Sequence, residues 1–326
     1  MRNIVAATCF RIVQIILLPV AAVAYVVLLI KLISYSRRSG ASATVLASFY
    51  TRWMQHKLGT RRDEACERLM NVLPNISQPA INLVAAPTLL GHRLTGYVPK
   101  SYRYPYGGVP PMSHQPAART TFYDAAVERH LVGVEQFVIL GAGLDTRSYR
   151  LPPQAHVQGF ELDTPKTQAF KREMLRRAGV DATRVTYVPV NFQVKDWFDK
   201  LMGVGFKPDR PSLFIWESVT MYLDREAVVD TLRTIAGTAG GTVVAFDYFA
   251  VEMLQSRSLF MRYARAVLKV FREPFGTFGI DHTPPARKQV AAFLESCGLS
   301  LEEHRNFGQE TAGKHAMAGF AIAIVP

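Results

Sequence analysis

The feature that most constrains the fold is a regular alternation of short apolar β-type runs with helical segments, which begins at Arg119. Such alternation predicts a mainly parallel sheet covered by helices on both faces. The expected strands are Gln136–Leu140, Val157–Leu162, Val185–Val190, Leu213–Trp216, Thr242–Asp247, Leu299–Asn306 and Met317–Val325, and the expected helices are Ala118–Val132, Pro165–Arg177, Val194–Met202, Arg225–Ala236 and Ala286–Cys297.

The last two expected strands have no helix between them. This predicts a hairpin, because antiparallel neighbours need only a short connection, whereas parallel ones need a crossover. We therefore expect an α/β Rossmann-like fold with five parallel strands, an antiparallel C-terminal hairpin and one antiparallel edge strand.

A glycine turn, Gly141-Ala142-Gly143, follows the first expected strand directly. In a doubly wound sheet this turn lies at the carboxyl edge, where ligands bind, and glycine lets the backbone approach a ligand closely. Many tight turns have the same sequence, so the tripeptide alone is a weak signal.

Two acidic residues, Glu161 and Asp163, end the second expected strand, about 20 residues after the glycine turn. A carboxylate at this position can accept hydrogen bonds from the hydroxyl groups of a ribose. The structural alternative is that Asp163 or Thr164 caps the helix that starts at Pro165. The glycine turn and the acidic strand end together indicate a ribose-containing cofactor more strongly than either does alone.

The chemistry of the turn argues against a dinucleotide. The third glycine of the dinucleotide motif is replaced by Thr146, and Asp145 would repel a phosphate. S-adenosylmethionine has a ribose and no phosphate, and acidic side chains near the turn suit its ammonium and sulfonium groups. Arg119, just ahead of the first strand, could pair with its carboxylate.

Four blocks resemble the leucine carboxyl methyltransferase family and, within it, bacterial-type S-adenosylmethionine-dependent methyltransferases. They lie between Arg119 and the C-terminus. The blocks are Ala118–Thr120, Leu140–Arg147 with Tyr149–Leu151, Phe160–Asp163 and Trp216–Leu223, and Phe275–Ile280 is also similar to a family segment.

The resemblance implies a class I methyltransferase sheet and assigns roles to single residues. Arg119 would hold the carboxylate of the cofactor, Gly141 and Gly143 its amino acid end, Asp163 its ribose, and Glu217 would face its methionine part. Where the family usually has Asp-Leu or Asp-Val after the third strand, this chain has Asn191-Phe192. An asparagine can still accept a hydrogen bond from the adenine amino group, and Phe192 can cover the ring.

Ahead of this domain, Ile12–Ile30 is a run of 19 residues with a single polar side chain, Gln14. As a helix it would span about 28 Å, close to the thickness of a bilayer core. We expect a single-pass membrane anchor; a cleaved signal peptide and a buried core helix are the alternatives. The basic residues on the two sides of this run are nearly equal in number, so they do not set its orientation in the membrane. We expect the catalytic domain on the cytoplasmic side, because that is where the cofactor is found.

The expected division of the chain is therefore an anchor in 1–40, a helical extension and Pro-rich connector in 41–118, and the cofactor-binding domain in 119–326. The chain has 38 Lys and Arg against 26 Asp and Glu. No run of basic residues accompanies this excess, so we expect a membrane rather than a nucleic acid as partner. Three distant cysteines predict neither a zinc site nor a disulfide framework.

The methyl acceptor is less constrained. The apolar segment 249–285 is expected to be a lid over an acceptor pocket, which with the anchor and the basic surface predicts a lipophilic small molecule or lipid. A carboxylate acceptor needs no base; a hydroxyl does, and the candidates are Tyr222, Asp281 and His282. The alternative functions are a membrane-tethered cofactor-binding protein without activity and a nucleotide-dependent oxidoreductase.

Overall fold

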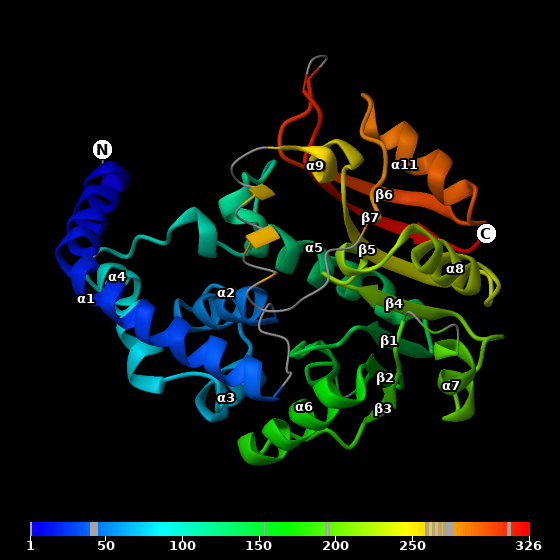
Figure 1. The fold of residues 1–326 in the computed structure, drawn as a ribbon, viewed down its shortest axis with the longest axis horizontal. Coiled ribbons are helices and arrows are strands. Elements are labelled where there is room, and N and C mark those ends of the chain that lie inside the picture. The colour runs from blue at the N-terminus through cyan, green and yellow to red at the C-terminus, as the bar shows by residue number, and fades with distance from the viewer. Residues whose placement is uncertain are drawn as a thin grey trace.

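A seven-stranded sheet forms the centre of the computed structural model (Figure 1), which describes residues 2–39, 45–152, 154–192, 194, 196–257, 261–262, 265–266, 269, 277–311 and 314–326. The strand order is β3-β2-β1-β4-β5-β7-β6, and β7 runs in the opposite direction to the other strands of this sheet. The strands are β1 Gln136–Leu140, β2 Gln158–Asp163, β3 Val185–Pro189, β4 Ser212–Trp216, β5 Val243–Phe249, β6 Ser300–Phe307 and β7 Ala318–Ile324. This is the Rossmann-like sheet of class I methyltransferases, as predicted.

The position of the antiparallel strand differs from the prediction. β7 lies inside the sheet between β5 and β6, and the edge strand is β6, which is parallel to β5. The amino-acid sequences of β6 and β7 explain this order. β7 is apolar and almost wholly buried, whereas β6 carries polar side chains that are mostly half-buried or exposed. An edge position suits the more polar strand, because one side of it faces solvent.

Helices cover both faces of the sheet. On one face α7 (Trp197–Gly203), α8 (Arg225–Ala236) and α11 (Ala286–Glu295) bury their apolar stripes against the strands. On the other face α5 (Gln115–His130) packs Phe122 and Tyr123 against β1, β4 and β7. α6 (Pro165–Ala178) follows β2 directly, and its N-cap is Thr164, whose hydroxyl accepts from the amide of Thr167.

Four further helices form the extension: α1 (Arg2–Ser39), α2 (Val45–Lys57), α3 (Glu64–Val72) and α4 (Gln78–Thr95). They share one apolar core, which also contains Leu144, next to the glycine turn, and Met174 and Leu175 of α6. The extension is therefore packed onto the sheet domain beside the carboxyl edge of the sheet and shares a core with it.

α1 extends well beyond the predicted run Ile12–Ile30. Among the described residues, Asn3–Tyr35 is the one helical stretch long and apolar enough to cross a membrane. α1 lies side by side with α4 at the far side of the molecule from β6 (Figure 1). Ala24 and Leu28 of α1 are buried in the extension core.

The predicted lid falls only partly on described residues. Phe249–Ser256, with α9 (Val251–Gln255), and residues 277–285 are described, and Ala250 forms an isolated parallel bridge with Ile280. Most of the apolar residues on which the prediction was based, from 258 to 276, lie outside the described residues, and so does Phe275 of the family segment.

Candidate functional site

The glycine turn lies at the carboxyl edge of the sheet, as predicted. The backbone amides of Gly141 and Ala142 donate to the carbonyl of Leu162 in β2, at 2.8 and 2.9 Å. Gly141 and Gly143 have φ angles of +69° and +42°. Because these angles are in the left-handed region, glycine adopts them at little cost. The turn is therefore fixed against the end of β2.

Asp163 holds the same turn from the end of β2. Its Oδ2 accepts a hydrogen bond from the amide of Gly143 and its Oδ1 from the amide of Thr164, both at 2.6 Å. Burial raises the pKa of Asp163, and the two amides oppose that rise. Each carboxylate oxygen can accept a second bond, so the group can also bind hydroxyls. The cap of α6 is Thr164 and not Asp163.

Gly141 allows a matched test of how closely the turn is packed. A Cβ at Gly141 would lie 2.3 Å from Cγ2 of Val219, whereas Gly59 has the same φ of +69° and nothing within 4 Å of its Cβ position. We expect Gly59→Ala to lose about 1 kcal/mol of unfolding free energy from the φ angle alone. Gly141→Ala should lose a further ~1–3 kcal/mol from overpacking. Urea unfolding of both variants checks this, and equal losses would contradict the close contact.

Glu161 is completely buried behind the turn. Its Oε2 lies 2.7 Å from Nζ of Lys171 and accepts a hydrogen bond from the hydroxyl of Tyr149 at 3.0 Å. Burial raises the pKa of Glu161, and the ammonium group of Lys171 opposes this. Oε2 of Glu161 is thus satisfied by side chains of the protein itself, whereas its buried Oε1 has no hydrogen-bond partner among the described residues.

A buried ion-pair network lies beside the turn. It contains four arginines and four carboxylates, which are Arg52, Arg61, Arg147, Arg150, Asp63, Asp124, Asp145 and Glu217. All except Arg150 have side chains less than a tenth exposed. Formal charges within the network balance, which is the condition under which buried charges are tolerated.

Arg147 is the centre of this network. Its Nη1 lies 2.5 Å from Oδ2 of Asp145 and 2.6 Å from Oε2 of Glu217, and its Nε donates to Asp124 at 2.8 Å. Arg52, from α2, donates to the same oxygen of Glu217 at 2.6 Å. Glu217 and Asp145, which were predicted to face the cofactor, are therefore already neutralised by guanidinium groups.

The other half of the network joins the extension to α5. Arg61 donates to Asp63 at 2.5 Å and to Asp124 at 2.6 Å, and Asp63 also accepts from the hydroxyl of Thr146. Burial alone would raise the pKa values of these carboxylates. The neighbouring guanidinium groups outweigh burial, so the pKa values of Asp63, Asp124 and Asp145 are all lowered.

Arg119 lies on α5 and forms a separate pair. Its Nη2 is 3.0 Å from Oδ2 of Asp247 in β5, and its Nη1 donates to the hydroxyl of Ser48 in α2 at 3.1 Å. Asp247 also accepts from the hydroxyl of Tyr123 and the amide of Ser218. Nε of Arg119 and Oγ of Ser218 are buried, and neither has a hydrogen-bond partner among the described residues.

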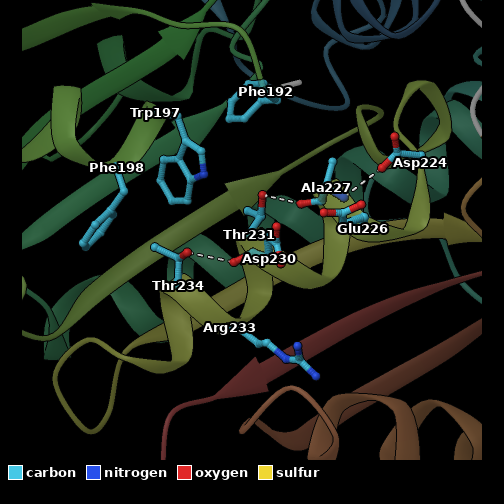
Figure 2. Close-up of a pocket in the computed structure, with 10 residues that line it drawn as sticks. All are labelled: Phe192, Trp197, Phe198, Asp224, Glu226, Ala227, Asp230, Thr231, Arg233 and Thr234. Atoms are coloured by element: carbon cyan, nitrogen blue, oxygen red, sulfur yellow. Dashed lines mark hydrogen bonds between the residues drawn. The ribbon is translucent and has the colours of Figure 1, made fainter. Parts of the chain in front are cut away.

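Asn191 and Phe192 follow β3 at the same edge. Asn191 is exposed, and Phe192 is half-buried with its ring 6.3 Å from that of Trp197. Phe192 borders a cavity of about 490 Å³ between the α7 region and α8 (Figure 2). In Figure 2 the rings of Phe192, Trp197 and Phe198 lie on one side and the acidic first turns of α8 on the other.

Two of the three candidate bases have structural roles. His282 is fully buried, with Nδ1 3.1 Å from the carbonyl of Ala316 and Nε2 2.9 Å from the hydroxyl of Tyr248. Asp281 accepts from the amide and hydroxyl of Thr283 in an exposed turn. Tyr222 lies in the 3-10 turn Thr220–Tyr222 after β4.

The sequence reasoning missed the contribution of the extension. Arg52, Arg61 and Asp63 come from segments that the family blocks do not cover. Arg147 and Arg150 lie inside a stretch that resembles the family, but the resemblance assigns no role to them. The available signal was the nearness of those two arginines to Asp145 in the sequence, since cations placed at a buried turn require nearby anions.

Comparison with known proteins agrees with this geometry. Residues 99–236 match the profile of the family described as leucine carboxyl methyltransferase. A "Putative S-adenosyl-L-methionine-dependent methyltransferase" of Mycobacterium avium is 33% identical over 197 residues, covering 58% of this chain and 60% of the relative. A similarly named protein of Mycolicibacterium smegmatis is 43% identical over 133 residues, covering 40% of this chain and 44% of that protein.

Among solved structures, an O-methyltransferase family protein from Burkholderia thailandensis resembles the chain with a TM-score of 0.43 and 14% identity, covering 65% of this chain and 59% of that one. The chain spans about 60% of the length of the Mycobacterium avium relative. The family profile covers α5, the glycine turn, Asp163 and Glu217. Residues 99–236 are therefore similar to the leucine carboxyl methyltransferase family.

Proposed function

We propose that the protein is an S-adenosylmethionine-dependent methyltransferase. The observation that carries the proposal is the hydrogen bond between the Gly143 amide and the Asp163 carboxylate, which joins the glycine turn to the ribose-binding position at the end of β2. The family match of residues 99–236 and the names of the relatives support it.

The residues present fit this cofactor. Asp163 can accept bonds from the ribose hydroxyls, and Asn191 and Phe192 would bind adenine. Arg119 would bind the cofactor carboxylate, since its buried Nε has no partner among the described residues. Glu217 would accept a bond from the ammonium group on oxygen lone pairs not used by Arg52 and Arg147. The glycines at 141 and 143 would let the amino acid end approach the backbone closely.

Two of the predicted site residues would act indirectly. Asp145 would orient Arg147, which in turn fixes Glu217. Glu161 would support the end of β2 through Lys171. Neither carboxylate then needs to touch the cofactor, because each is already paired with a cation of the protein.

When bound, S-adenosylmethionine supplies an electrophilic methyl group and leaves as a neutral thioether. The chain's task is to align the acceptor with that methyl and to exclude water. The buried network keeps Asp124 and Asp145 ionised, since their pKa values are lowered, so this part of the electrostatic environment is fixed before ligands arrive.

A carboxylate is the acceptor that this site suits best, ahead of a hydroxyl. A carboxylate oxygen attacks without losing a proton, whereas a hydroxyl needs a base. Both ring nitrogens of His282 and the carboxylate of Asp281 are engaged in structural contacts. The apolar helix α1, the predicted lid and the basic charge favour a lipophilic small molecule or lipid at a membrane, with the catalytic domain on the cytoplasmic side.

Titration of the full-length protein with S-adenosylmethionine tests the cofactor. We expect micromolar binding, no binding of NADH, and at least a tenfold loss of affinity in Asp163→Ala, since hydrogen bonds to a carboxylate contribute about 1.5–3 kcal/mol. Asp199→Ala, at an exposed position of α7, is the control and should bind as the parent does. A folded parent that does not bind S-adenosylmethionine would remove the methyltransferase proposal.

The acceptor class is tested with S-adenosylmethionine labelled in its methyl group and fractionated cell extracts. We expect label in the lipid-soluble fraction, released as methanol by mild alkali, because methyl esters hydrolyse under these conditions and methyl ethers do not. Alkali-stable label would indicate a hydroxyl acceptor. Label confined to soluble proteins or polar metabolites would contradict the lipophilic acceptor.

A further inference from the structure

We infer that α1 and α4 together form a monotopic membrane unit, which lies along the surface of a bilayer in one leaflet and does not cross it. This inference rests on the membrane attachment contained in the proposed function and replaces a single-pass anchor by a different geometry. It does not depend on the methyl-transfer chemistry.

The two helices present a shared apolar outer surface. Ile12, Val23 and Ile30 of α1 are each at least half exposed, and Leu90 and Leu94 of α4 are exposed as well. A soluble monomer rarely exposes so many large apolar side chains together, and such a patch marks a membrane or protein contact. The exposed apolar residues of the pair are Ile4, Val5, Ile12, Ile15, Ile16, Leu18, Val20, Val23, Tyr25, Val26, Val27, Ile30, Leu83, Leu90 and Leu94.

The helices pack against each other as an antiparallel pair. Near one end the ring of Phe10 lies over Gly91, where an added Cβ would come within 2.7 Å of it. At the other end Nζ of Lys31 donates to the carbonyl of Ile76, at 2.8 Å. Figure 1 shows α4 beside α1, at the same side of the molecule. Between Phe10 and Lys31, α1 is thus attached to the protein and does not project from it.

The chain after α4 limits how far the Phe10 end can be from the domain. The rings of Phe10 and Tyr97 are 5.1 Å apart. Five residues later, the carbonyl of Tyr102 accepts from the hydroxyl of Thr60, beside the end of α2. Five residues of extended chain reach at most about 18 Å. The Phe10 end of α1 therefore lies close to the extension core.

The distance that these five residues can span is too short for α1 to cross the bilayer. The 21 residues from Phe10 to Lys31 span about 31 Å, which is the thickness of the hydrocarbon core. With Lys31 at the near surface, Phe10 would lie at the far surface, and Tyr102 and Thr60 would be drawn into the hydrocarbon. A helix lying along the bilayer leaves both at the water-facing side.

Charge identifies the partner as an anionic lipid surface. Residues 1–123 contain 14 Lys and Arg but only three Asp and Glu, a net charge of +11, whereas residues 124–326 have a net charge of +1. Three of the 14, Arg52, Arg61 and Arg119, are buried against carboxylates of the second range, and the others remain in excess. Neither α1 nor α4 contains an acidic residue, and Arg11, Lys31 and Arg93 are exposed on them. Basic side chains beside an apolar face favour anionic headgroups.

An in-plane helix ordinarily needs a polar face of its own. α1 has none, since apolar residues surround it, but its inner face is covered by α4 and by the extension core. In a free amphipathic helix the face turned away from the lipid contacts water. In α1 that face contacts the rest of the protein instead. The remaining perimeter of α1 is apolar and free to contact acyl chains.

Depth measurements on spin-labelled full-length protein in vesicles of phosphatidylcholine and phosphatidylglycerol test the inference. Labels are placed singly at Val5, Val23 and Ile30, which point to one side of α1 and are all exposed, in a Cys9→Ser background because Cys9 is exposed while Cys66 and Cys297 are buried. We expect all three labels at one depth, about 5–10 Å below the phosphates. A label at Leu90 should also contact lipid, and one at Val132, on the sheet domain, should remain in water.

A spanning helix gives a different profile. Val23 would then lie about 10 Å deeper than Ile30, and Val5 would react with a membrane-impermeant reagent only from the opposite side. That profile overturns the inference. Dipolar coupling between the α1 labels of two copies, with no contact between these labels and lipid, also overturns it, because α1 would then be covered by a second copy of the chain. Recovery of a protein that has been cleaved after α1 would also overturn the inference, because the segment would then be a signal peptide. Loss of S-adenosylmethionine binding with a flat depth profile would remove the proposed function alone.

Discussion

Replacing Arg147 with Met is expected to lower the free energy of unfolding by about 3–5 kcal/mol, because it leaves buried carboxylates without their partner. Arg147 contacts Asp124, Asp145 and Glu217 at 2.5–2.8 Å, and its side chain is only 2% exposed. Methionine fills much of the same volume, so the loss would report charge and not a cavity. Urea unfolding of the full-length protein in detergent measures the change.

The matched control is Arg210→Met. Arg210 pairs with Glu135 on the surface, where both side chains are about half exposed. A surface pair of this kind contributes at most about 1 kcal/mol. The double variant Arg147→Met/Asp124→Asn should recover part of the loss, since it removes one uncompensated charge. Equal losses for Arg147→Met and Arg210→Met would show that the network does not behave as a buried one.

Lys171→Met is expected to cost a similar ~3–5 kcal/mol at neutral pH, because Glu161 is completely buried and Lys171 is its cationic partner at 2.7 Å. The double variant Lys171→Met/Glu161→Gln should regain most of this, since no charge is then left inside. A single variant as stable as the parent would mean that Glu161 is already protonated in the folded protein.

The same variant has a predictable pH dependence. Burial raises the pKa of Glu161, Lys171 opposes the rise, and removing Lys171 raises the pKa further. The folded state then keeps a proton that the unfolded state loses above its ordinary pKa of about 4.5. Stability therefore falls with rising pH, by up to ~1.4 kcal/mol per pH unit between those two pKa values. Unfolding midpoints measured from pH 4 to 8 should show this slope in Lys171→Met and not in the double variant.

Most of the sheet could be predicted because its strands carry local signals. β1 and α8 agree with the predicted bounds, and the other strands differ by one or two residues at either end. The order of the hairpin could not be read from spacing alone. Both orders of β6 and β7 satisfy the same connection length, and only the comparison of a polar β6 with an apolar β7 separates them.

The parts of the site that are built from neighbouring strands could be predicted. The parts that depend on residues far apart in the sequence could not. The contact between Gly143 and Asp163 follows from two adjacent parallel strands, whose carboxyl ends must meet. The pairing of Arg52 with Glu217 joins residues 165 positions apart, and no periodicity encodes it. The packing of α1 on α4 was missed for the same reason, since α1 has apolar residues on every side and its sequence does not mark a contact face.

The shared ion-pair network limits how this protein can be divided and recombined. A fragment that begins at Arg119 would keep Asp124, Asp145 and Glu217 but lose the guanidinium groups of Arg52 and Arg61. Homologous domains could not be exchanged at that boundary without leaving an excess of negative charge beside the glycine turn. The smallest transferable module therefore begins no later than α2, and the evolutionary histories of extension and sheet are expected to be linked through these salt bridges.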